Sequence, residues 1–225
     1  MLLHTDDFEY YFEGNFCLPG EKKPFTGTLE VSSDKNPFNL KSVLNHRINF
    51  KDGKYHGVYE LFGNEGYLQI KDHYKNGDLH GIREEFYENG KLQIRERYKD
   101  GQRHGVSKGF YKNGKLEVRA RYKNDQLHGI REKFFANGKP VSRRNYAYGE
   151  SHGLYEEFFK SGVIKIREHY DANERHGLSE HFYENGKPVF RHNYSYSELH
   201  GVSEHFYENG NLKSRQHYRN GLPKK

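Results

Sequence analysis

Seven histidines recur at a constant interval of 24 residues, and histidine is the commonest side chain in transition-metal sites. Each is followed by glycine, at His56, His80, His104, His128, His152, His176 and His200. In a β-repeat, equivalent residues lie two strands apart, about 9–10 Å, too far to share a zinc ion with bonds of about 2.1 Å. We therefore expect these histidines to be structural, with no metal and no cofactor. A second histidine group near the end of the chain is expected to be solvated surface: His169, His181, His192, His205 and His217.

Carboxylates follow the same interval. If the residue after each repeat histidine is position one, position four is glutamate in six units: Glu60, Glu84, Glu132, Glu156, Glu180 and Glu204. Paired carboxylates can act as general acid and base, but a regular ladder singles out no pair. The chain also contains no Ser-His-Asp order, no phosphate-binding loop and no HExxH motif. We expect no enzymatic activity.

Aromatic residues and arginines form two further ladders. Position seven carries Tyr87, Tyr111, Phe135, Phe159, Tyr183 and Tyr207, and position fifteen carries Arg95, Arg119, Arg143, Arg167, Arg191 and Arg215. Tyrosine and arginine are enriched at the energetic centres of protein interfaces. Both positions are odd, so regular alternation along a strand predicts one odd face that binds a partner. The alternative is that both ladders only support the sheet, with aromatic neighbours packing and arginine pairing with glutamate.

Positions where the repeat varies are further candidates for partner contacts. They include Tyr155, Glu157, Tyr148 and Tyr196.

The elements that must position these ladders are hairpins. Each unit contains two runs of about eight residues, rich in aromatic and β-branched side chains and separated by Asn-Gly or Asp-Gly signals. In "YENGK" (87–91) we favour a three-residue loop with glycine as a left-handed bulge, because it places Phe86 opposite Leu92. With regular alternation the even positions, which carry most of the apolar residues, would then share the other face.

The constant period makes the repeat array the fold. We predict an all-β protein, an elongated single-layer antiparallel sheet of tandem 24-residue hairpins. Residues 1–24 are expected to form an N-terminal cap, residues 25–55 a degenerate first repeat interrupted by the insertion "SSDKNPFN", and residues 56–225 seven regular repeats in one continuous array.

The composition agrees with a thin structure that has little core. Of 225 residues, 33% are hydrophobic and 30% charged, but 16% are aromatic, which argues against disorder. The net charge of +6 permits an acidic partner without requiring nucleic acid. The single cysteine, Cys17, excludes an internal disulfide. No signal peptide or long apolar run is recognisable, so we expect a cytoplasmic protein.

The segments "YENGKL" (87–92), "YKNGDLHG" (74–81) and "PFTG" (24–27) resemble the MORN repeat variant of bacterial antitoxins and immunity proteins, over residues 25–223. The resemblance implies a curved single-layer sheet used as a binding surface, often with a toxin as partner. We therefore expect a protein-binding module that neutralises a co-encoded toxin by occluding its active site. The alternative is a scaffold that binds nucleic acid or acidic lipid headgroups through the arginine and tyrosine ladders.

Overall fold

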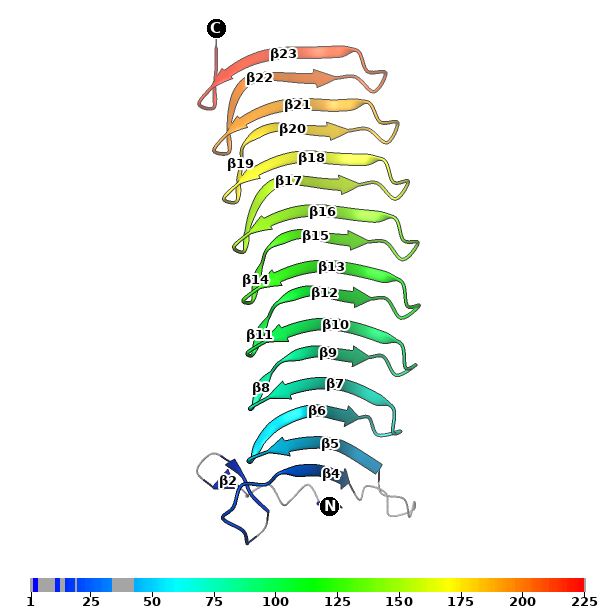
Figure 1. Cartoon of the computed structure of the whole chain (residues 1–225). Helices are drawn as coiled ribbons and strands as arrows, with labels where there is room; N and C mark the ends of the chain where they lie inside the picture. The colour runs from blue at the N-terminus through cyan, green and yellow to red at the C-terminus, as the bar shows by residue number, and fades with distance from the viewer. Residues whose placement is uncertain (1, 4–10, 13–14, 19, 34–42, 225) are drawn as a thin grey trace. The chain divides into compact units, whose positions relative to one another are not determined.

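The computed structural model describes residues 2–3, 11–12, 15–18, 20–33 and 43–224 (Figure 1). All of its regular elements are β-strands, and none of the described residues is helical. None of them therefore forms a helix that could span a membrane. The chain divides into two compact units, Met1–Gly114 and Lys115–Lys225, which are described one at a time.

Unit 1 is an antiparallel sheet with one parallel pair, β1 with β4, and a separate two-stranded pair, β2 with β3. Its strands are β1 (Leu2–Leu3), β2 (Tyr11–Phe12), β3 (Asn15–Phe16), β4 (Gly27–Ser33), β5 (Val43–Lys51), β6 (Lys54–Phe62), β7 (Leu68–Lys75), β8 (Asp78–Leu79), β9 (Gly81–Phe86), β10 (Leu92–Lys99), β11 (Gln102–Arg103) and β12 (Gly105–Phe110).

Unit 2 continues the same pattern in an antiparallel sheet. Its strands are β13 (Leu116–Lys123), β14 (Gln126–Leu127), β15 (Gly129–Phe134), β16 (Pro140–Ala147), β17 (Glu150–Phe158), β18 (Ile164–Asp171), β19 (Glu174–Arg175), β20 (Gly177–Phe182), β21 (Pro188–Ser195), β22 (Glu198–Phe206), β23 (Leu212–Arg219) and β24 (Leu222–Pro223). The all-β fold of 24-residue antiparallel hairpins is thus confirmed.

In the described hairpins from β6–β7 onward, the loop is the predicted three-residue loop. Between β9 and β10 the Tyr87 amide donates to the Lys91 carbonyl at 2.9 Å, and the Gly90 amide donates to the Tyr87 carbonyl at 2.8 Å. Gly90 has a φ of +74°, a left-handed conformation that glycine adopts without steric cost. Phe86 pairs with Leu92, as expected.

The turn between successive hairpins is a two-residue turn. Lys75 pairs with Asp78, and the residues between them, Asn76 and Gly77, have φ values of +54° and +97°. Left-handed conformation at both central residues is the requirement of a type I′ turn, whose twist matches that of the flanking strands.

A bulge follows the first pair of the hairpins β6–β7 and β9–β10. Phe86 pairs with Leu92, but the next pair is Glu85 with Ile94, so Gln93 is an extra residue. The same shift recurs in unit 2, for example between Glu157 and Phe158. From the bulge onward, the second strand presents its odd positions on the face where the first strand presents its even ones.

The predicted division into one even and one odd face is therefore wrong. Glu84 pairs directly with Arg95, so positions four and fifteen share a face. Positions fourteen, sixteen and eighteen of the second strand lie on the other face, beside positions three and five of the first. Because the bulge contains no glycine or proline, the sequence pattern did not reveal it.

The repeated His-Gly pair marks a second irregularity in the ladder. The His80 amide donates to the His73 carbonyl at 2.8 Å, outside regular pairing, and Gly81 has a φ of +114°. The glycine is needed here because a side chain is strained in this conformation.

The hydrophobic core of unit 1 lies at its N-terminal end. Phe16 packs with Leu29, Val31, Ile48 and Phe50, all at most 5% exposed. Most of the predicted insertion "SSDKNPFN" lies outside the described residues, as does part of the N-terminal cap.

Candidate binding faces

In each unit, one side of the sheet carries a ladder of ion pairs between position four and position fifteen, and we name it the Glu–Arg face of that unit. In unit 1, Arg47 donates to both Glu30 and Glu60 at 2.9 Å, and Lys71 lies 3.7 Å from Glu60. Arg95 and Glu84 follow, at 2.6 Å. Each glutamate accepts from a cation on a neighbouring strand, which explains why the repeat keeps a carboxylate there.

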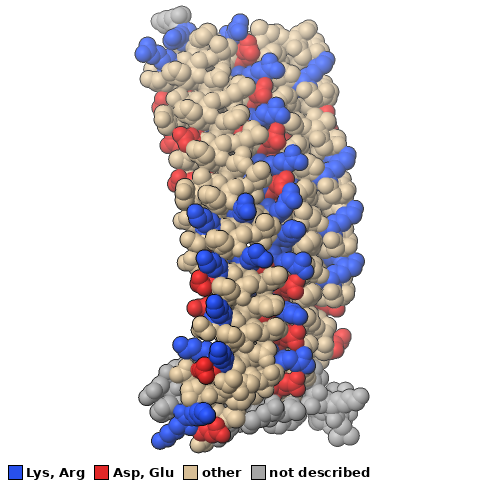
Figure 2. Space-filling view, viewed as in Figure 1, with Lys and Arg blue, Asp and Glu red and all other residues tan. Residues whose placement is uncertain are grey.

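Unit 2 repeats this ladder. Glu132 binds both Arg119 and Arg143, and the next three pairs are Arg167–Glu156 at 3.1 Å, Arg191–Glu180 at 3.0 Å and Arg215–Glu204 at 3.1 Å. In Figure 2 the alternating charges form a column of blue and red within each unit. The candidate arginines of position fifteen are therefore paired with carboxylates. This is the arrangement expected if the arginine ladder supports the sheet and does not bind a partner.

The same face exposes aliphatic residues at position two, with Ile82 36%, Val106 43% and Ile130 53% exposed. Position two is therefore not part of a buried apolar surface, whereas Phe158 at position six of the same face is 9% exposed.

The aromatic residues of position seven lie elsewhere, at the loop end of each hairpin. The Tyr87 hydroxyl donates to the Phe110 carbonyl at 2.7 Å, and the Tyr183 hydroxyl donates to the Phe206 carbonyl at 3.2 Å. Tyr207 is 51% exposed. These side chains do not share a face with the position-fifteen arginines, so the two candidate ladders are not brought together.

The opposite side of each unit's sheet, the Tyr face, is defined by the position-eighteen tyrosines and the residues that share their side. These tyrosines are Tyr74 and Tyr98 in unit 1, and Tyr122, Tyr146, Tyr170, Tyr194 and Tyr218 in unit 2. In unit 1, Tyr74 contacts Tyr55 and Tyr59 edge to face, at centroid distances of 5.2 and 6.2 Å. Asp72, 2% exposed, lies beside them and binds Arg83 at 3.2 Å. Burial is the largest influence on Asp72, and it raises the pKa of this carboxyl.

In unit 2 the Tyr face contains a stack of rings and guanidinium groups. Arg144 lies 4.1 Å from the ring centroid of Tyr155 and 4.9 Å from that of Tyr170. The Tyr155 hydroxyl donates to Glu157 at 3.0 Å. Tyr155 and Glu157, predicted from the variable positions of the repeat, thus lie together on this face.

Glu168 is the best-connected carboxylate of the Tyr face. It accepts from Tyr170 at 2.7 Å and Ser179 at 3.2 Å, and its Oε1 lies 3.6 Å from Nε2 of His181. The contact with His181 is the main reason that the pKa of Glu168 falls to about 2. Burial, followed by the hydrogen bond to Glu168, raises the pKa of Tyr170 to about 12.

Three of the C-terminal histidines cluster on the Tyr face. Nε2 of His192 lies 3.2 Å from Nε2 of His205, and the ring of Phe190 stacks between His181 and His192 with both centroid distances 4.1 Å. Within the described residues, no three histidine, cysteine, aspartate or glutamate side chains are arranged to hold a metal ion.

The repeat histidines lie beside the two-residue turns. His80 lies 3.1 Å from Asp100, and His152 lies 3.1 Å from Asp171. The ring of His128 contacts Tyr148 at 5.4 Å, and that of His176 contacts Tyr196 at 5.1 Å. Tyr148 and Tyr196, two of the variable positions, are therefore exposed turn residues held against a histidine ring.

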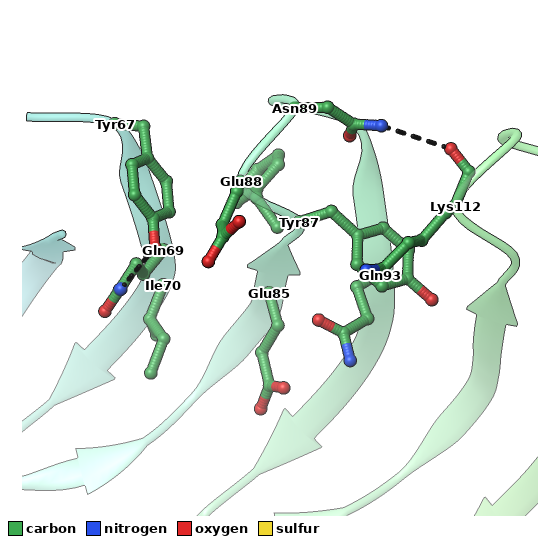
Figure 3. Close-up of a pocket in the computed structure, with 10 residues that line it drawn as sticks. Tyr67, Gln69, Ile70, Glu85, Tyr87, Glu88, Asn89, Gln93 and Lys112 are labelled. Carbon is green, nitrogen blue, oxygen red and sulfur yellow. Dashed lines mark hydrogen bonds between the residues drawn. The ribbon is translucent and has the colours of Figure 1, made fainter. Parts of the chain in front are cut away.

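A pocket of about 500 Å³ opens at the loop end of unit 1, on the side of the Tyr face. Figure 3 shows the side chains that line it, with Glu85 and Glu88 between a wall formed by Tyr67, Gln69 and Ile70 and another formed by Tyr87 and Gln93.

Two features of these sites escaped sequence reasoning. The Tyr face was missed because position eighteen was assigned to an apolar face, although acidic residues recur two positions before it at Asp72, Glu96 and Glu168. The pocket was missed because the first regular 24-residue repeat was treated like the other repeats. Its sequence signal is Gly63 at position seven, where all other units have an aromatic residue.

Comparison with known families agrees with this repeat geometry. The family model of the MORN repeat variant matches six consecutive segments, residues 79–100, 103–124, 127–148, 151–172, 175–196 and 199–220. No curated protein matches the chain. The six segments make up more than half of the 225 residues and coincide with the hairpin repeat. MORN repeat proteins are generally modules that bind proteins or membrane lipids. The chain belongs to the MORN repeat variant family, and it is a repeat-based binding module.

Proposed function

We propose that this protein binds another protein through the Tyr face, and that it acts as an antitoxin or immunity protein that neutralises a co-encoded bacterial toxin in the cytoplasm. The observation that carries the proposal is the stack of Arg144 on Tyr155 and Tyr170. Aromatic and arginine side chains that are already held in place lose little conformational freedom on binding, and they dominate the energetics of protein interfaces.

A protein partner fits the charges better than a polyanion. A surface that binds nucleic acid or acidic lipid presents cations that can exchange counterions for phosphate. On the Glu–Arg face, each position-fifteen arginine is instead bound to a glutamate. On the Tyr face, Glu157 and Glu168 lie among the cations.

The mechanism is occupancy. The Tyr face covers the active site or substrate channel of the toxin, and the net charge of +6 assists association with an acidic toxin surface. This mode of action requires no catalytic group on the antitoxin.

The first experiment tests the biological role. The reading frames beside the gene are expressed one at a time in a bacterial host, with and without this protein. We expect one neighbour to arrest growth alone and to be tolerated when this protein is co-expressed and binds it. If no neighbour is toxic, or if protection occurs without binding, the proposal fails.

The second experiment tests the binding face. The triple substitution Arg144→Ala, Tyr155→Ala and Tyr170→Ala removes the stack, whereas Ile130→Ser, Arg143→Ala and Leu178→Ser change three residues of the Glu–Arg face in the same unit. We expect the first variant, if folded by circular dichroism, to bind the toxin at least about tenfold more weakly and the second to bind like the wild type.

The reverse result would assign binding to the Glu–Arg face. Affinity for heparin, DNA or anionic vesicles that falls steeply with salt, without a protein partner, would favour the polyanion alternative.

A further inference from the structure

The repeat is broken at one hairpin, between β6 and β7. Position seven is Gly63 there, although the other six units have tyrosine or phenylalanine. Position eleven of the same unit is Tyr67, where four other units have lysine: Lys91, Lys115, Lys139 and Lys187. In this repeat the aromatic residue thus stands just before β7, whereas in the other repeats it follows the first strand of the hairpin.

The two changes depend on each other. A Cβ atom at Gly63 would lie 2.5 Å from Cε1 of the Tyr67 ring, so only glycine leaves room for that ring. The backbone of Gly63 is outside the left-handed region, which means that glycine is required for space and not for conformation. The Gln69 side chain donates to the Tyr67 hydroxyl at 2.9 Å and holds the ring in place (Figure 3).

With glycine at position seven and tyrosine at position eleven, this repeat lacks two hydrogen-bond donors that other repeats direct at the next hairpin. They are a tyrosine hydroxyl and a lysine ammonium. At Tyr87 and Tyr183, the position-seven hydroxyl donates to the carbonyl of the next hairpin's position-six phenylalanine, which is Phe110 and Phe206 respectively. The equivalent carbonyl for Gly63 is that of Phe86, which receives no such donor.

The second lost donor is a lysine ammonium. The position-eleven lysine donates to a carbonyl of the next loop, as Lys91 does to Asn113 at 3.3 Å and Lys187 does to Asn209 at 2.7 Å. Tyr67 cannot replace this contact with the loop at Asn89. Phe86 and Asn89, the two residues whose carbonyls lose these donors, both line the pocket of about 500 Å³.

The pocket is therefore rich in acceptors and acidic. Arg83 makes both of its contacts with Glu85 through Oε1, at 3.2 and 2.7 Å, which leaves Oε2 for a ligand. Glu88 is exposed on the loop and has no ion pair within the described part of the chain. Among the described residues that line the pocket, Lys112 is the only cationic one, and its ammonium lies 5.9 Å from the ring centroid of Tyr87.

We propose that this pocket binds the side chain of an arginine from the partner protein. A guanidinium carries five donors in one plane, so it can satisfy carboxylate and carbonyl oxygens in several directions while its face stacks on a tyrosine ring. Lysine offers a compact charge without a planar face and fits the two tyrosine walls less well. The proposal rests on the proposed function only for the source of the arginine.

The first test needs no partner. The peptide acetyl-Gly-Arg-Gly-amide is titrated into the full chain by calorimetry, beside the same peptide with citrulline, the neutral isostere of arginine. We expect millimolar binding of the arginine peptide and binding of the citrulline peptide at least about tenfold weaker. Equal affinities, or no binding of the arginine peptide at about 10 mM, would overturn the proposal and leave toxin capture through the Tyr face unaffected.

Two variants locate the binding. Glu88→Gln removes one pocket charge, and Glu184→Gln makes the same change at the equivalent loop position of unit 2. We expect the first to weaken arginine binding about tenfold and the second to have no effect. Equal effects would place the peptide outside the pocket.

The double substitution Gly63→Tyr and Tyr67→Lys restores the pattern of the other units and should close the pocket. We expect this variant to fold, with an unchanged circular dichroism spectrum, and to lose binding of the arginine peptide. Retained binding in the folded variant would overturn the assignment.

Discussion

The guanidinium of Arg144 lies 4.1 Å from the ring centroid of Tyr155, and the neighbouring Arg143 points to the opposite face, where it binds Glu132 at 3.3 Å. Two consecutive arginines thus occupy different environments. Substituting each with glutamine separates their contributions to stability. We expect Arg144→Gln to lower the free energy of unfolding by about 1 kcal/mol, since its cation–π contacts are partly desolvated. Arg143→Gln should cost less, about 0.5 kcal/mol, because its ion pair is half exposed. Thermal unfolding measures both, and equal losses would contradict the assignment.

The ladder of the Glu–Arg face has one mismatch in unit 1, where Lys108 pairs with Arg95. Like charges opposite each other on antiparallel strands are destabilising. Lys108→Glu should therefore stabilise the protein by about 0.5 kcal/mol at low salt, and the gain should shrink as salt is added. Lys123→Glu, the same charge change at an exposed strand end, serves as the control. If both variants melt alike, the ladder does not contribute to stability through these charges.

Tyr148 occupies a turn position that suits asparagine better. Its φ is +52°, a left-handed conformation unfavourable for an aromatic residue, and its side chain is 68% exposed. We expect Tyr148→Asn to raise the free energy of unfolding by about 0.5 kcal/mol, because asparagine tolerates this conformation. Chemical denaturation tests this expectation. A less stable variant would show that the contact of Tyr148 with His128 outweighs the backbone strain.

His192 makes stability depend on pH. Burial, and then the nearby His205, His181 and Arg175, lower the pKa of His192 to about 4. An unfolded histidine titrates near 6.5, so between about pH 6.5 and 4 the unfolded chain binds more protons and stability falls as the pH is lowered. The melting temperature of His192→Gln should fall less between pH 7 and 4.5 than that of the wild type. His217→Gln, at an exposed site, is the control. Parallel pH profiles of His192→Gln and the wild type would exclude this role.

Local sequence signals predicted the hairpins and their loops well. The Asn-Gly pair at Asn89 and Gly90 forms the expected three-residue loop, because glycine alone reaches the required conformation cheaply. The opposition of Phe86 and Leu92 follows from that loop. These features depend on residues close together in the chain, where turn chemistry is decisive.

The distribution of side chains between the two faces could not be predicted. It depends on the bulge at Gln93, a residue with no conformational signature. Arg95 was therefore expected to share a face with Tyr87 but lies beside Glu84, so the pairing of arginine with glutamate remained only an alternative until the register was known. The pocket depends on the contact between Gly63 and Tyr67 across a hairpin, which becomes visible only when the two strands are paired.

The bulge also has a mechanical consequence. In unit 2 the register shifts at the same place in four hairpins, beside Phe134, Phe158, Phe182 and Phe206. Each bulge bends its strand, so the bends of neighbouring strands fall on one line, and the arched strands of Figure 1 follow it. A sheet that is bent along one line resists further bending across that line. We therefore expect one extra residue per hairpin to stiffen the thin sheet of unit 2 across this line of bends.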